Sequence, residues 1–88
     1  EVLKMVKETI LMLENHQREI NLYENSIIPQ LNVALNSALR AYEVDRVDLL
    51  SVLEIQKMLI ENKLEYYRAQ VNYFITVAEL EQWLGVNF

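Results

Sequence analysis

The spacing of apolar residues constrains the fold of this chain more than any other feature. Through residues 3–41, one position recurs at alternating steps of three and four, and only two of its occupants are polar. This first seam comprises Leu3, Val6, Ile10, Leu13, Gln17, Ile20, Glu24, Ile27, Leu31, Ala34, Ala38 and Ala41. Such a seam predicts an α-helix that packs against another helix along its length.

The second half of the chain carries two seams of this kind. One comprises Leu50, Leu53, Lys57, Ile60, Leu64, Tyr67, Val71, Phe74 and Ala78. The other comprises Val52, Ile55, Leu59, Asn62, Tyr66, Ala69, Tyr73, Thr76, Leu80 and Trp83. At about 100° per residue the two seams lie roughly 150° apart. A helix with opposed apolar seams needs a neighbour on each side, as in a wall of helices; a helix inside a compact bundle is the alternative.

The chain of 88 residues contains one Gly and one Pro, too few turn residues to connect the strands of a sheet. We therefore predict a single all-α domain over residues 1–88, folded as a long antiparallel helical hairpin of the coiled-coil type. Its helices are expected at about 2–43 and 48–84, with the tip at 44–47.

Several residues predict where these helices start, stop or bend. Pro29 predicts a break or a kink in the first helix, because proline lacks the N–H and clashes with the preceding turn. Asn25 and Ser26 are candidate caps of a restarted helix, Asp45 or Asp48 is a candidate N-cap of the second helix, and Gly85 is a candidate C-cap.

Composition excludes several functions. The net charge of −5 provides no basic field for nucleic acid, and without cysteine there is neither a disulfide nor a Cys-based metal site. The single histidine, His16, lies two residues after Glu14, a spacing that does not place the two side chains on one helix face for a shared metal ion. We expect no catalysis, metal or cofactor, because no nucleophile or pocket accompanies the paired carboxylates of Glu61 and Glu65. No apolar run is long enough to cross a membrane.

The ordered motifs of the chain resemble the outer membrane efflux protein family, the TolC-like channels, and within it the heavy-metal resistance branch. The segments concerned are LYENSIIPQLNVALNSALRAYEVDRVDLLSVLEIQ and YYRAQVNYFITVAELEQWLG. The matching elements are Ile28-Pro29-Gln30, Tyr42, Val44-Asp45, Leu49-Leu50-Ser51-Val52-Leu53, Gln56 and the stretch from Leu80 to Gly85. The resemblance covers nearly the whole chain.

This resemblance implies one hairpin from the periplasmic α-barrel of a trimeric bacterial outer-membrane protein. It implies that the hairpin forms part of a conduit wall and docks a periplasmic adaptor (membrane fusion) protein and an inner-membrane pump at its tip. The tip residues are Val44, Asp45, Arg46 and Val47. Asp45 stands where the family has Gly; it either offers a carboxylate to an adaptor arginine or only caps the second helix.

The same resemblance implies candidates for the lumen and the gate. Tyr42 matches a tyrosine that latches the closed tip, although the arginine of that latch falls at Val47. Ser51 and Glu54 match carboxylates that narrow the lumen in some relatives, and only Glu54 keeps the charge. The acidic face that also includes Glu61 and Glu65 is either a solvated surface or an acidic lumen.

Two other functions remain open at this stage. A hairpin from a periplasmic adaptor predicts one dominant seam per helix, and a free-standing structural coiled coil could dimerise into a four-helix bundle. A hairpin excised from a barrel leaves one apolar seam without its barrel neighbour, which predicts self-association of the isolated chain.

Overall fold

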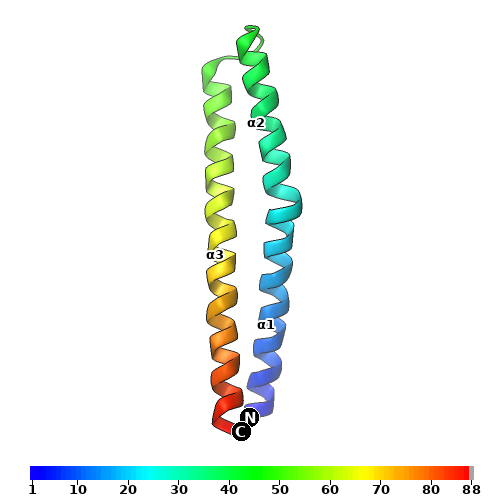
Figure 1. The fold of residues 1–88 in the computed structure, drawn as a ribbon, viewed down its shortest axis with the longest axis vertical. Coiled ribbons are helices and arrows are strands. Elements are labelled where there is room, and N and C mark those ends of the chain that lie inside the picture. Colours follow the sequence, from blue (N-terminus) through cyan, green and yellow to red (C-terminus); the bar gives the residue numbers. More distant parts are fainter. Residues whose placement is uncertain (88) are drawn as a thin grey trace.

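A computed structural model describes residues 1–87 of the chain. The elements are α1 (Val2–Leu22), the π-helical turn η1 (Tyr23–Ile27), α2 (Ile28–Glu43) and α3 (Leu49–Asn87). α1, η1 and α2 form one continuous arm, and α3 returns beside it so that the start of α1 and the end of α3 lie at the same end of the molecule (Figure 1). The molecule measures 65 × 15 × 15 Å, and no strand occurs within residues 1–87. The predicted all-α helical hairpin is confirmed.

α3 packs on the other arm with the seam that begins at Val52. Its four buried residues all belong to that seam, and its other members through Trp83 are half-buried. The buried four are Val52, Leu59, Ala69 and Thr76. We call these residues and the rest of their seam the covered face of α3.

The face that α1 presents to α3 differs from the predicted first seam. The predicted members Leu3, Ile10, Gln17 and Glu24 are exposed. The positions just before them are buried or half-buried: Val2, Thr9, His16 and Tyr23. The predicted seam of α1 is therefore correct at Val6, Leu13 and Ile20. At the four alternate positions the interface residue lies one position earlier in the sequence than predicted.

Buried threonines on the two arms are satisfied within their own helices. The hydroxyl of Thr9 donates a hydrogen bond to the Met5 carbonyl, and that of Thr76 donates to the Asn72 carbonyl, each at 2.8 Å. A threonine hydroxyl that bonds the carbonyl four residues back needs no polar partner from the neighbouring helix. Thr9 can thus occupy an interface position at which a sequence pattern expects an aliphatic residue.

The π turn explains how both halves of the first arm pack on one straight partner. Buried and half-buried positions recur along this arm at steps of three and four, with Ser26, Ile28 and Leu35 half-buried beside them. From Tyr23 through Ile27 to Leu31, two steps of four occur in succession. That is one residue too many for a heptad. The Ile28 N–H bonds to the Tyr23 carbonyl, five residues back, so the turn takes up the extra residue.

The predicted break at Pro29 does not occur, and the helix runs through it with αR backbone at Ile27 and Ile28. A proline and a π turn each leave a carbonyl without its usual α-helical donor. Because the π turn and Pro29 are adjacent, the regular α-helical hydrogen bonding is interrupted at one place rather than two. Asn25 and Ser26 are not caps, and the Ser26 hydroxyl accepts a hydrogen bond from Gln30 at 3.2 Å.

The end of α3 also differs from expectation. Gly85, a predicted C-cap, lies inside α3 and does not have a positive φ. A glycine ends a helix when it adopts the left-handed conformation, and this one does not.

Candidate functional site

The tip is built by a Schellman motif that ends α2. The Arg46 N–H donates to the Ala41 carbonyl at 2.8 Å, and the Asp45 N–H donates to the Tyr42 carbonyl at 3.0 Å. These are the 6→1 and 5→2 hydrogen bonds of the motif, which requires a left-handed residue at the position of Asp45. Asp45 has a φ of 59°, and aspartate tolerates this conformation better than most residues. Asp45 therefore takes the left-handed position that glycine most often fills at the end of a helix.

Asp48, rather than Asp45, caps α3. Its Oδ1 accepts hydrogen bonds from the Ser51 N–H at 2.9 Å and the Ser51 hydroxyl at 2.8 Å. These bonds, the backbone bond foremost, hold the pKa of Asp48 below its ordinary value of 3.8. The expectation that one of the two aspartates caps the second helix is correct for Asp48 and wrong for Asp45.

The remaining tip side chains form a small exposed surface. Val44, Asp45 and Arg46 are exposed, Val44 at 63%, and Val47 is half-buried. Among the residues that the structure describes, no hydrogen bond or ion pair engages the Asp45 carboxylate. Since the cap of α3 is supplied by Asp48, this carboxylate is free for another partner.

The lumen and gate candidates lie on two helices at the tip end of the hairpin. Tyr42 lies exposed in the last turn of α2, while Ser51 and Glu54 lie in the first turns of α3. Ser51 is bound to Asp48, and Glu54 is exposed. No hydrogen bond in the described part of the chain joins Tyr42 to Ser51 or Glu54. The bonds between Ser51 and Asp48 give Ser51 a structural role at the start of α3.

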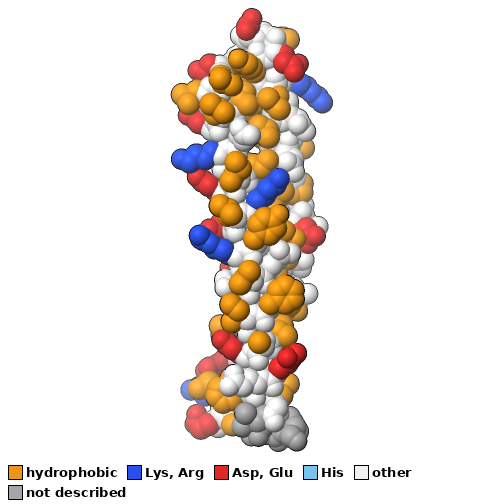
Figure 2. All heavy atoms as spheres, turned by 60° about the vertical axis from the view of Figure 1, so that its left-hand side comes forward, with side chains coloured by type: hydrophobic (Ala, Val, Ile, Leu, Met, Phe, Trp, Pro, Cys, Tyr) orange, Lys and Arg blue, Asp and Glu red, His pale blue; other side chains and the backbone are white. Residues whose placement is uncertain are grey.

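The larger feature is the other seam of α3, which nothing in this chain covers. Every member is exposed, including Leu53 near the tip and Phe74 far from it. We call this seam the open stripe; it comprises Leu50, Leu53, Lys57, Ile60, Leu64, Tyr67, Val71, Phe74 and Ala78. Figure 2 shows hydrophobic side chains following the α3 side of the molecule for most of its length. A shallow hollow lies on it, lined by Leu64, Tyr67, Arg68, Val71 and Asn72.

The open stripe leaves the molecule with more surface than a compact protein has. The accessible area is 6712 Å² for a mass of 10.4 kDa. A compact monomer of this mass would expose about 5400 Å². No described side chain is less than 2% exposed, so the hairpin has no fully enclosed core.

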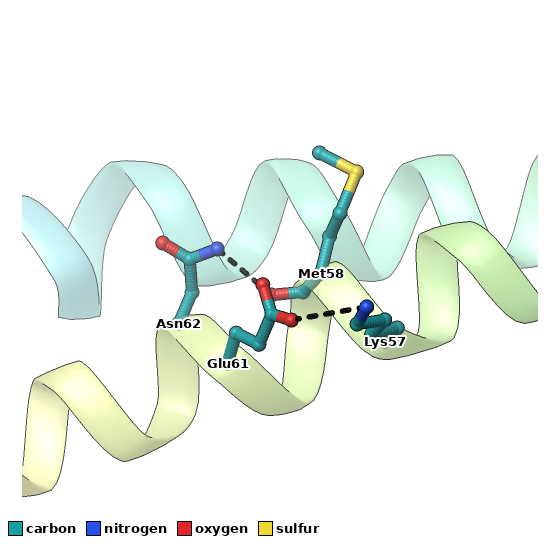
Figure 3. Close-up of polar contacts among 4 residues, drawn as sticks. All are labelled: Lys57, Met58, Glu61 and Asn62. Atoms are coloured by element: carbon teal, nitrogen blue, oxygen red, sulfur yellow. Dashed lines mark hydrogen bonds and ion pairs between the residues drawn. The ribbon is translucent and has the colours of Figure 1, made fainter.

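Polar side chains of α3 make local contacts along the helix, including Lys57 of the open stripe and Asn62 of the covered face. Lys57 and Glu61 approach to 3.9 Å, and Arg68 and Glu65 to 2.8 Å, all on the exposed surface. Figure 3 shows Lys57 and Glu61 next to Asn62, whose amide donates to the Met58 carbonyl at 2.8 Å. Asn62 is a polar member of the covered face, and this bond to its own helix satisfies its amide nitrogen.

His16 lies half-buried between the arms. Its Nδ1 is buried and has no hydrogen-bond partner among the described residues. Within residues 1–87 no group of acidic or histidine side chains could hold a metal ion. His16 is therefore a packing residue of the hairpin.

Sequence reasoning missed that Asp48 and Ser51 form one hydrogen-bonded unit at the start of α3. The spacing of an aspartate three residues before a serine was the available signal, since an N-cap oxygen accepts from the third residue of the helix.

Comparison of the chain with protein-family models, with curated proteins and with solved structures finds no match. Among the described residues, no helix combines the length and the hydropathy needed to span a membrane.

Proposed function

We propose that this chain is a wall element of a conduit: one helical hairpin from the periplasmic α-barrel of a TolC-like outer-membrane efflux channel. The observation that carries the proposal is the pair of opposed apolar faces on α3. One face is covered by the first arm and the other is open along the helix, with polar residues between them. A helix of this kind fits a wall with a neighbouring hairpin on its far side and water on both surfaces.

In this role the hairpin performs no chemistry. Its tip docks the periplasmic adaptor and, with it, the inner-membrane pump, in a channel assembled as a homotrimer. The free carboxylate of Asp45 supports docking, because a carboxylate accepts a charge-assisted hydrogen bond from an arginine. Glu54, Glu61 and Glu65 would give one wet surface of the wall a negative charge.

A hairpin of an adaptor protein accounts less well for the open stripe, since two helices that only pack on each other need one seam apiece. A free-standing coiled coil that pairs with itself would use the stripe and is the second candidate.

The proposal is tested by photo-crosslinking in the bacterium that makes the chain. A photoreactive residue at Val44 is expected to capture an adaptor protein. The same residue at Glu8, which is exposed near the other end of the hairpin, is the control and should not capture it. Crosslinking of an adaptor from neither position, or equally from both, would contradict docking at the tip.

A further inference from the structure

We infer that the open stripe of α3 is a self-complementary surface on which a second copy of this chain packs antiparallel, with the two-fold axis between Ile60 and Leu64, level with residue 62 along the helix. This inference concerns the 88-residue chain itself and does not depend on the proposed function.

The size of the stripe fits a stable interface. Seven of its apolar members are between 48% and 69% exposed. At about half of side-chain areas near 200 Å², they offer on the order of 700 Å² of apolar surface. Specific interfaces bury about 800 Å² on each partner. Soluble monomers rarely expose a contiguous apolar patch above about 300–600 Å².

An antiparallel pairing about an axis level with residue 62 matches the stripe to itself from end to end. Antiparallel coiled coils place each position of the seam opposite the other type of seam position. The pairs between the two copies are Leu50 with Phe74, Leu53 with Val71, Lys57 with Tyr67, and Ile60 with Leu64. Each apolar residue except Tyr67 thus meets an apolar residue, and no member from Leu50 to Phe74 is left over.

The one charged member, Lys57, decides between the two orientations. In a parallel pair, Lys57 would face Lys57 of the second copy inside the seam, which places like charges together. In the antiparallel pair its aliphatic stem packs on the ring of Tyr67 of the second copy, and its ammonium remains near Glu61 of its own helix, 3.9 Å away (Figure 3).

Light scattering of the purified chain tests the contact. The expected mass is twice the chain mass of 10.4 kDa. Leu64→Lys is expected to give a monomer of unchanged helicity, because Leu64 does not pack in the hairpin. Ile75→Lys is the matched control, since Leu64 is 55% exposed on the stripe and Ile75 is 52% exposed outside it. A monomeric native chain, a larger oligomer, or a dimer that survives Leu64→Lys would each overturn the inference.

Disulfide formation tests the orientation, because the chain has no cysteine of its own. Leu50→Cys alone should form no disulfide-linked dimer, since its two copies would lie about 36 Å apart along the helices. A mixture of Leu50→Cys and Phe74→Cys should form the mixed disulfide. Crosslinking of Leu50→Cys with itself, or failure of the mixture to crosslink, would overturn the antiparallel register.

Discussion

The two apolar faces of α3 are alike in sequence and differ in what the hairpin does with them. Leu59, on the covered face, is 6% exposed, while the next residue, Ile60, on the open stripe, is 54% exposed. Both seams have the same spacing, and the open stripe is at least as apolar as the covered one. Apolarity alone therefore does not determine which face packs within a chain. The register of the first arm and the geometry of the tip decide it.

The largest effect is expected from a change in that register. Deletion of Asn15 would carry Glu8 and Met12 into the interface positions of Thr9 and Leu13. Loss of several half-buried contacts, together with a carboxylate in the interface, should cost about 3–5 kcal/mol of the free energy of unfolding. Thermal unfolding followed by circular dichroism measures this.

Deletion of Asn25 is the matched control for that experiment. It removes the extra residue taken up by the π turn, so that the arm becomes a regular α-helix with every interface position retained. We expect a Tm within a few degrees of the native chain. Equal losses from the two deletions would show that the π turn does not set the register.

Substitution of neighbouring residues measures the difference between the faces directly. Leu59→Ala should lower the free energy of unfolding of the hairpin by about 2–3 kcal/mol. Ile60→Ala should lower it by less than about 1 kcal/mol when both are compared in the monomeric Leu64→Lys background. Chemical denaturation gives both values, and equal losses would place α3 in a different rotation about its axis.

Substitutions at the tip should have smaller effects on stability, because the tip residues connect the two arms and contribute little to the packing between them. Asp45→Ala should cost about 1–2 kcal/mol, since a non-glycine residue without a short polar side chain is strained at this φ. Asp45→Gly should not destabilise the hairpin, and Asp45→Asn should leave its Tm almost unchanged. If docking uses the carboxylate, Asp45→Asn nevertheless weakens adaptor crosslinking from Val44; unaltered crosslinking would leave Asp45 with its backbone role alone.

The smallest effect concerns the pH dependence of the cap. The pKa of Asp48 is lowered in the folded hairpin, so its contribution to stability is complete above the ordinary value of 3.8 that applies to the unfolded chain. That contribution is lost as the pH falls through the folded pKa. The Tm of the native chain should therefore fall more steeply with acid than that of Asp48→Ala. If the Tm of the two chains fell equally with pH, the Asp48 carboxylate would not stabilise the start of α3.

Much of this structure could be predicted from the sequence, and the exceptions have physical causes. The hairpin and the two seams of α3 follow from spacing alone, because apolar periodicity survives over many turns. The face of α1 that packs on α3 does not follow from spacing alone, because Leu3 and Ile10 are more apolar than Thr9 and His16, which occupy the interface instead. Thr9 is accepted because its hydroxyl bonds its own helix.

The tip shows the same limit. The left-handed φ of Asp45 and the choice between Asp45 and Asp48 as the cap both came from the structure, the latter from the hydrogen bonds of Ser51. At Pro29 the sequence signals only that a backbone N–H is missing. The helix nevertheless continues, because the π turn just before Pro29 accommodates the extra residue between Tyr23 and Leu31.

The central claim is that the open stripe is covered by a neighbour in the working assembly. Single cysteines at Leu64 and Ile75 test it, since the two sites are about equally exposed in the isolated hairpin and the native chain has no cysteine. In intact cells that produce the channel proposed here, a small permeant maleimide should label the cysteine at position 75 rapidly and the one at position 64 only after denaturation. Equal labelling of both in intact cells would contradict the account.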